Sequence, residues 1–415
     1  MKFTKKSFSL LTSLILILFV PVFTFADDSV YVWSSLDEVT SLVSNNITED
    51  YTDDSTNPLD LDCGSAILIE QTTGEILYSY NSHEQLRPAS VTKIMSLLLI
   101  MEAIESGQID YDTEIPCSEN AASMGGSQIW LDTTETLSVD DMLKAICVVS
   151  ANDCVVAMAE YIAGTEEGFV AMMNQKAEEL GMNDTTFKNC HGIDEDGHVT
   201  SSYDIALMSK ELLNNYPEIT EYTTIWNDTL RDGESTLVNT NKLVRNYEGC
   251  TGLKTGSTSE ALFNLSASAT RDDLSLIAVV MKAPTSNIRF NNATSLLNYG
   301  FNNFEFSSLA TENEVIQSVT VQKGTSSSIN ALVESNVGIL VTKGNDINVD
   351  KTISISDNIE APINVGDVIG TVTFTLNDEI VGSCNLVADA SVDKLNITSM
   401  SKIVFNNWFN LLRDT

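Results

Sequence analysis

The feature that most constrains the fold is an apolar stretch that follows the Pro88-Ala89-Ser90 segment. Residues 94–104 are almost entirely aliphatic or Met, broken only by Ser96 and Glu102. As a helix this stretch would be apolar around most of its circumference, and such a helix is stable in water only when other elements surround it. The sequence therefore predicts a helix buried at the centre of a sizeable domain.

The segments around this helix predict a mixed fold with a later all-β part. Apolar runs at 66–69 and 76–78, joined by a Thr-Thr-Gly turn, indicate a hairpin. From about residue 306 the chain changes to short Val, Ile and Thr runs separated by turn residues, which predict a separate small β-sandwich. Between these parts, helical patterns occupy 138–163, 165–180 and 203–214, and strand patterns occupy 262–269 and 274–281. We expect an α/β or α+β domain over 60–305 and a β-rich domain over 306–392.

Charge and composition exclude several classes of function. The 415 residues include 58 Asp and Glu against 22 Lys and Arg, a net charge of −36, and we find no basic stripe that could hold nucleic acid. Seven Cys, an odd number without Cys-x-x-Cys spacing, indicate buried thiols, and Cys147 and Cys154 are too far apart on a helix to pair. Three His are too few for a His-based zinc site, so we predict no metal and no cofactor.

The two ends of the chain carry targeting signals. Residues 1–26 combine three Lys, an apolar run and a terminal Thr-Phe-Ala, the three parts of a secretory signal peptide, although an uncleaved anchor is the alternative. Residues 27–59, rich in Asp, Ser, Thr and Asn, predict an acidic, polar and solvated leader. Residues 393–415 repeat apolar side chains every three or four positions with a net charge of +1, which predicts an amphipathic helix at a membrane surface, with docking on the β domain as the alternative. We expect export to the outer face of the cytoplasmic membrane.

Ser90 and Lys93 form the strongest candidate for chemistry. They are three residues apart at the start of the apolar helix, so both side chains lie on one face, and the helix N-terminus favours negative charge nearby. A serine hydroxyl becomes nucleophilic when a base takes its proton, and an apolar environment lowers the pKa of a lysine. The tetrapeptide alone is weak evidence, because Ser391/Lys394 and Ser399/Lys402 repeat the spacing, and a Ser-Asp-Asn occurs at 356–358.

Unlike the other two Ser-x-x-Lys matches, Ser90/Lys93 is followed along the chain by two further motifs. Ser-Ala-Asn follows at 150–152, and the single Lys-Thr-Gly occupies 254–256. This trio resembles that of the serine penicillin-binding proteins and β-lactamases, and most closely the low-molecular-mass penicillin-binding proteins, the serine-type D-Ala-D-Ala carboxypeptidases of the bacterial cell wall. The resemblance rests on residues 88–95, 125–127, 150–152, 189–192, 252–256, 288–290 and 296–301. It covers roughly residues 60–415, since that family also has a C-terminal β domain and a membrane-binding tail.

The resemblance implies a transpeptidase-like fold, an antiparallel sheet flanked by helices with a helical lobe. It also implies a peptidase that removes the terminal D-Ala from peptidoglycan stem pentapeptides and is acylated by β-lactam antibiotics. Ser90 would be the acylated nucleophile, with Lys93 as general base, Ser150 as proton relay and Asn152 holding the substrate amide. Lys254 would keep the pKa of Lys93 low.

Substrate binding is implied at four further positions. Thr255 and Arg289 would hold the terminal carboxylate, for which basic and hydroxyl donors are suited. Gly256 and Ser257 continue the binding strand, and the N–H groups of Ser90 and Ser257 would form the oxyanion hole. The alternative for Arg289 is a surface ion pair, and we interpret His191 as structural rather than catalytic.

Two other functions remain open. Ser-Ala-Asn in place of Ser-Asp-Asn at 150–152 weakens a class A β-lactamase interpretation, but a β-lactamase-like hydrolase of the same fold is one alternative. The second is a penicillin-binding or wall-binding protein without turnover. Release of D-Ala from a D-Ala-D-Ala peptide separates these functions.

Overall fold

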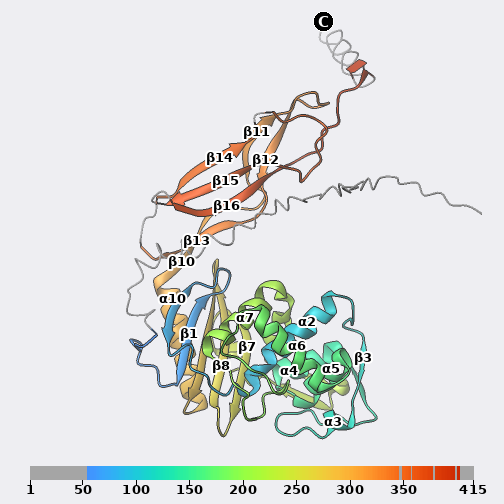
Figure 1. Cartoon of the computed structure of the whole chain (residues 1–415), viewed down its shortest axis with the longest axis vertical. Coiled ribbons are helices and arrows are strands. Elements are labelled where there is room, and N and C mark those ends of the chain that lie inside the picture. Colours follow the sequence, from blue (N-terminus) through green and yellow to red (C-terminus); the bar gives the residue numbers. More distant parts are fainter. Residues whose placement is uncertain (1–53, 345–347, 357, 377–378, 398–399, 402–415) are drawn as a thin grey trace, which may run out of the picture.

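In the computed structural model the chain forms two units, and Figure 1 shows them one beyond the other along the long axis. The structure describes residues 54–344, 348–356, 358–376, 379–397 and 400–401. The N-terminal unit mixes a sheet with helices, and the C-terminal unit is built from strands. This organisation confirms the predicted fold class.

A five-stranded antiparallel sheet forms one half of the N-terminal unit. Its order is β2-β1-β9-β8-β7, so β7 lies at an edge. The predicted hairpin is β1 and β2, and alternate β1 residues face opposite sides: Ile67 joins one core cluster and Leu68 the other. The strands are β1 (Ser65–Glu70), β2 (Ile76–Tyr80), β7 (Cys250–Thr258), β8 (Leu262–Arg271) and β9 (Leu274–Ala283).

Helices cover both faces of this sheet. α10 (Ser286–Asn303) packs on one face, and α7 (Ser202–Asn215) packs on the other between the sheet and the helical lobe. The predicted central helix is α2 (Lys93–Glu105), preceded by the 3-10 turn η2 (Ala89–Thr92), and every residue of α2 from Lys93 to Met101 is buried. The prediction of a buried central helix is therefore confirmed.

The remaining helices and short elements complete the lobe around α2. Three of the helices begin with Ser or Thr caps: Ser138, Thr165 and Ser201 each accept a hydrogen bond from a first-turn N–H. The helices are α3 (Glu119–Ala122), α4 (Val139–Val148), α5 (Asn152–Ala163), α6 (Glu166–Glu179), α8 (Thr220–Thr223), α9 (Leu243–Asn246), η3 (Pro217–Ile219) and η4 (Arg231–Gly233). The short strands are β3 (Glu114–Pro116), β4 (Thr136–Ser138), β5 (Asn227–Leu230) and β6 (Ser235–Val238).

The helix predicted over 138–163 is two helices, so that prediction is wrong at its centre. α4 ends at Val148 and α5 begins at Asn152. Ser150 between them has a φ of 66°, in the left-handed region that non-glycine residues seldom adopt. The apolar pattern continues through the break because both helices are buried, so periodicity could not reveal it.

The C-terminal unit is the predicted β-sandwich. A five-stranded sheet, ordered β11-β12-β16-β15-β14, packs against the pair β10-β13. Alternate residues such as Val333, Val372 and Leu386 fill its core. The strands are β10 (Phe304–Ala310), β11 (Val315–Thr320), β12 (Ser328–Val333), β13 (Val337–Thr342), β14 (Asp350–Ile355), β15 (Val368–Leu376) and β16 (Glu379–Ala388).

The predicted signal peptide, most of the leader and most of the terminal helix lie outside the described residues. The last leader residues differ from the expectation of a solvated segment. Asp54 bonds the Ser79 hydroxyl and accepts from Ser82 N at 2.6 Å, and the Tyr78 hydroxyl donates to Asn57 at 2.8 Å. These polar side chains satisfy groups of β2 and the turn after it, so the folded unit already includes residue 54.

The described residues include every cysteine of the chain. All seven cysteines are unpaired thiols, five of them buried, and Cys147 and Cys154 lie in different helices, α4 and α5. In the described part of the chain, no helix has the length and apolar character needed to span a membrane.

The burial of α2 predicts a large effect of truncating its core side chains. Leu98 is fully buried in α2, so Leu98→Ala should lower the free energy of unfolding by about 2–5 kcal/mol. Met172→Ala, at an exposed position of α6, is the control and should change it by about 0.5 kcal/mol or less. Urea denaturation followed by circular dichroism measures both, and equal losses would contradict the central role of α2.

Candidate active site

Ser90 and Lys93 are brought together at the start of α2. Lys93 Nζ lies 3.2 Å from Ser90 Oγ, 2.6 Å from Asn152 Oδ1 and 2.6 Å from the His191 carbonyl oxygen. The Lys93 side chain is fully buried, whereas Ser90 is partly exposed. The nucleophile candidate thus faces solvent, with the amine behind it.

Burial and a second lysine lower the pKa of the Lys93 amine. Desolvation holds the pKa of Lys93 well below its usual value, and the neighbouring charge of Lys254 lowers it further. Lys254 projects from β7 and donates to the Thr255 carbonyl at 3.0 Å. Burial lowers the pKa of Lys254 to about 7, and the Arg289 charge acts in the same direction. Burial and the Lys254 charge both favour the unprotonated form of the Lys93 amine.

Ser150 and Asn152 come from the break between α4 and α5. Asn152 Oδ1 accepts from Lys93, and its Nδ2 donates to the Gly125 carbonyl at 2.7 Å. Ser150 is 3% exposed, and its hydroxyl has no hydrogen-bond partner in the described part of the chain. An unpartnered buried hydroxyl costs free energy unless a bound molecule uses it.

Asp153, a residue that sequence reasoning missed, holds the loop at 125–131 against the start of α5. The Asp153 carboxylate accepts from Ile129 N at 3.0 Å and Leu131 N at 3.1 Å, and Asn152 N donates to the Ser127 carbonyl at 2.7 Å. An acidic residue inside an otherwise apolar helical run was the available signal. Such a residue needs donors, and here it finds backbone N–H groups.

β7 approaches the backbone of Ser90 so closely that only glycine fits. A Cβ on Gly256 would lie 2.9 Å from Pro88 O and from Ser90 N, and one on Gly192 would lie 1.9 Å from Ala89 O. Asn264 of β8, another residue that the sequence did not reveal, donates to the carbonyls of Arg87 at 2.8 Å and Pro88 at 3.0 Å. Ser257 follows on β7 with an exposed side chain. The predicted oxyanion-hole donors therefore belong to two segments in direct contact.

Thr255 and Arg289 lie at the same edge of the sheet. The Thr255 hydroxyl is 2.7 Å from the Thr240 hydroxyl. Arg289 Nη1 donates to the carbonyls of Gly256 at 3.1 Å and Asn264 at 3.0 Å. Arg289 is 5% exposed and forms no ion pair among the described residues, so the alternative of a surface ion pair is wrong.

His191 supports Lys93 through its backbone. Its carbonyl accepts from Lys93, and its ring Nδ1 accepts from Ile193 N at 3.1 Å. Burial lowers the pKa of His191 to about 3, so the ring is neutral although Glu166 lies 3.4 Å away. This agrees with a structural role. His198, which sequence reasoning passed over, bonds the Thr92 hydroxyl at 2.8 Å in the turn that carries Ser90.

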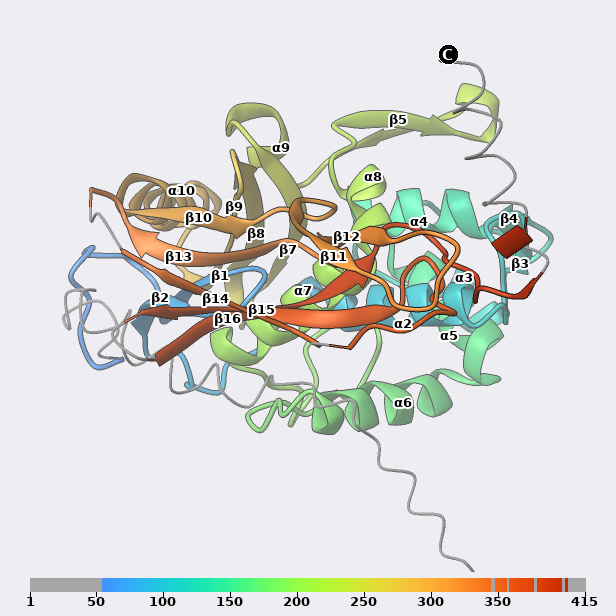
Figure 2. The same ribbon diagram turned by 90° about the horizontal axis from the view of Figure 1, so that it is seen from above.

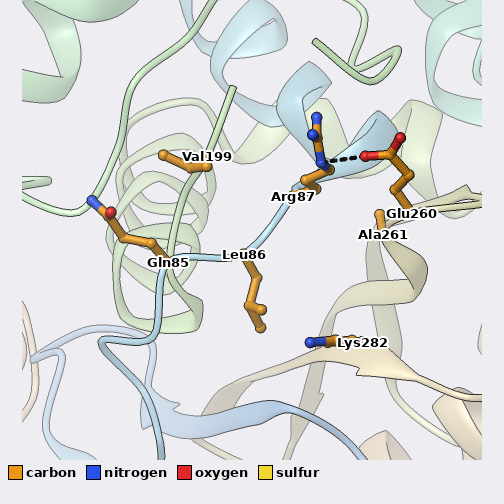
Figure 3. Close-up of a pocket in the computed structure, with 7 residues that line it drawn as sticks. All are labelled: Gln85, Leu86, Arg87, Val199, Glu260, Ala261 and Lys282. Atoms are coloured by element: carbon orange, nitrogen blue, oxygen red, sulfur yellow. Dashed lines mark ion pairs between the residues drawn. The ribbon is translucent and has the colours of Figure 1, made fainter. Parts of the chain in front are cut away.

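A pocket of about 320 Å³ lies beside the segment that leads into Ser90, and Figure 3 shows the side chains that line it. None of the predicted site residues lines it. Arg87, just before η2, forms an ion pair at 2.7 Å with Glu260 in the turn after β7. The pocket wall therefore ties the segment before Ser90 to the strand that carries Lys254. It is lined by Gln85, Leu86, Arg87, Val199, Glu260, Ala261 and Lys282.

A serine hydroxyl against a buried lysine amine, beside a strand edge that carries a second lysine, defines a serine acyl-transfer enzyme. A family model for D-alanyl-D-alanine carboxypeptidases matches residues 52–285, and one for the C-terminal domain of penicillin-binding protein 5 matches residues 304–394. The chain belongs to the D-alanyl-D-alanine carboxypeptidase family, as the motifs predicted.

Individual relatives agree with the family match. The D-alanyl-D-alanine carboxypeptidase DacF of Bacillus subtilis is 43% identical over 357 residues, which cover 85% of this chain and 92% of the relative. Penicillin-binding protein 5 of Haemophilus influenzae is similar in structure, with a TM-score of 0.64 and 30% identity, over 82% of this chain and all of that one. Penicillin-binding protein D2 of Listeria monocytogenes, solved in its ampicillin-bound form, has a TM-score of 0.55 and 30% identity, over 59% of this chain and all of that one.

The charge of Lys254 predicts a specific pH effect. Lys254→Met removes the positive charge that lowers the pKa of Lys93, so the pKa of Lys93 should rise. A base acts only when unprotonated, so acylation is lost as the pH falls through this pKa. We therefore expect the acid limb of the pH profile for acylation by a fluorescent penicillin to move to higher pH.

The control for this measurement is Lys351→Met, which removes a charge of the same sign from strand β14 of the other unit. It should leave the acid limb in place. An acid limb that stays at the same pH in Lys254→Met would contradict the proposed coupling between the two lysines.

Proposed function

We propose that Ser90 is the acylated nucleophile of this D-Ala-D-Ala carboxypeptidase and that Lys93 is its general base. The observation that carries the proposal is the set of three contacts made by Lys93 Nζ. Two of its partners, Asn152 Oδ1 and the His191 carbonyl oxygen, can only accept hydrogen bonds. A neutral amine has two protons and one lone pair, so with both protons used there, the lone pair points to the third partner, the Ser90 hydroxyl.

Acylation follows from this arrangement. Ser90 Oγ attacks the carbonyl carbon of the penultimate D-Ala of a stem peptide, and its proton passes to Lys93 Nζ. The N–H groups of Ser90 and Ser257 stabilise the oxyanion that forms. The C–N bond then breaks, and the proton moves from Lys93 through the Ser150 hydroxyl to the amine of the leaving D-Ala. The unpartnered state of the Ser150 hydroxyl supports this relay.

Deacylation returns the enzyme to its starting state. Water attacks the carbonyl carbon of the Ser90 ester and gives one proton to Lys93. The bond between that carbon and Ser90 Oγ then breaks, Lys93 passes the proton to Ser90 Oγ, and the shortened peptide leaves with a new carboxyl end. In the preceding acylation step, Asn152 orients the substrate amide, and Thr255 and Arg289 bind the terminal carboxylate. A β-lactam acylates the same hydroxyl, a proposal supported by the similarity to the Listeria protein solved with ampicillin.

Replacing the nucleophile tests these assignments. Ser90→Ala should abolish covalent labelling by penicillin and reduce release of D-Ala from a D-Ala-D-Ala peptide by at least about a thousandfold, because no acyl-enzyme can form. Ser391→Ala, which removes the serine of another Ser-x-x-Lys match, is the control and should keep both activities. Labelling that survives in Ser90→Ala would assign the nucleophile elsewhere. Long-lived labelling without D-Ala release by the wild type would point to the binding protein.

We also propose that the protein is exported, with residues 1–26 removed, and held at the outer face of the membrane by residues 393–415. The sequence patterns of both segments support this proposal. The bridge between Lys394 and Gly324, and the bond from Leu395 N to the Lys323 carbonyl, attach the start of the tail to the β unit. A truncation that removes 397–415 therefore spares the folded unit.

Fractionation tests the localisation. The full-length protein should begin at Asp27 by N-terminal sequencing and should sediment with membranes, whereas the protein lacking 397–415 should be released while keeping its penicillin labelling. If the truncated protein sediments equally well, the tail is not the anchor. A full-length protein that retains residues 1–26 would make that segment the anchor.

A further inference from the structure

Thr240 lies at the proposed carboxylate site, although no motif marks it. It is in the loop between β6 and α9, and its hydroxyl is 2.7 Å from that of Thr255. Thr240 is exposed, whereas Thr255 is 6% exposed. The two hydroxyls therefore form a pair that runs from solvent to the strand that carries Lys254.

Two buried asparagines fix this loop. Asn239 Nδ2 donates to the Ile225 carbonyl at 2.7 Å, and Asn241 Nδ2 donates to the Gly252 carbonyl of β7 at 2.9 Å. Thr240 N itself donates to the Val148 carbonyl at 3.1 Å, two residues before Ser150. Thr240 thus links the two segments that carry the site, and its side chain is held at Thr255 by contacts on both sides.

We propose that Thr240 is a positioning residue that sets the direction of the Thr255 hydrogen bond and thereby selects substrates with a free terminal carboxylate. The inference rests on the proposed function, in which Thr255 binds that carboxylate. A hydroxyl has one proton to donate, and a carboxylate can only accept. When Thr255 donates to the substrate, its contact with Thr240 must therefore run the other way, with Thr240 donating to Thr255.

This polarity discriminates between peptide ends. With one of its two lone pairs taken by the Thr240 proton, the Thr255 hydroxyl is turned so that its own proton points to the substrate, beside the donors of the nearby Lys254 and Arg289 side chains. A terminal carboxylate can accept hydrogen bonds from all three of these donors. The NH2 group of a terminal carboxamide would instead face donors and find no acceptor. Without the Thr240 hydroxyl, Thr255 can turn and accept from the carboxamide, so selectivity falls.

The test compares two peptides, one ending in D-Ala-D-Ala and the other in its C-terminal carboxamide. Thr240→Val keeps the shape and removes the hydroxyl, and Thr240→Ser keeps the hydroxyl. Thr236→Val, at an exposed threonine of β6, is the matched control. We expect Thr240→Val to lower kcat/KM for the carboxylate about tenfold, as for the loss of one charge-assisted hydrogen bond, with little change for the carboxamide. The Ser variant and the control should keep the wild-type ratio.

The outcomes separate this inference from the proposed function. If the wild type releases D-Ala but Thr240→Val lowers both substrates equally, or lowers neither, Thr240 is structural and the inference is overturned. In a Thr255→Val background, Thr240→Val should have no further effect on the ratio, and an additive loss would also overturn it. If the wild type releases no D-Ala from the free-carboxylate peptide, the proposed function fails, and this inference fails with it.

Discussion

The burial of the Lys93 amine is the constraint on which the proposed chemistry depends. Burying an ammonium group away from water costs free energy unless each of its protons has an acceptor. Two of the groups around Lys93 Nζ are carbonyl oxygens, and the third is the Ser90 hydroxyl, which can either accept a proton from the amine or donate its own. The apolar surface of α2 excludes water from one side, and the break between α4 and α5 supplies Asn152 from another. The neutral amine is favoured because the fold gives the charged form little solvation and places Lys254 nearby.

A second constraint is the close contact between β7 and the turn that carries Ser90. Gly256 leaves room for these two backbones to meet, and Gly192 lets a separate loop approach Ala89. Asn264 of β8 donates to the carbonyls before Ser90. The same contact brings the backbone of the turn next to the backbone of the strand. Hydrolysis of a peptide with a charged end thus needs no metal in our proposal, since backbone donors and two basic side chains supply the positive potential. In a chain of net charge −36, these few buried cations stand out.

The sequence was informative wherever a short pattern has one physical meaning. An all-round apolar helix had to be central, alternating strands had to form a sandwich, and a hydroxyl and an amine three positions apart on a helix had to meet. It failed where the decisive contact joins distant segments. Nothing local marks the partners of Thr240, Asp153 or Asn264, since each acts through a residue 15 or more positions away. The left-handed Ser150 was hidden because buried helices on both sides continue one apolar pattern.

The measurement that most directly tests this account is a titration of the Lys93 amine in the folded, substrate-free protein. Nuclear magnetic resonance of protein carrying 13C- and 15N-labelled lysine, with the Lys93 signal assigned by its loss in Lys93→Arg, reports the protonation of Nζ. The account predicts a pKa far below the ordinary lysine value of about 10.4. A pKa near that ordinary value would mean that the amine stays charged at neutral pH, and Lys93 could not be the base that activates Ser90.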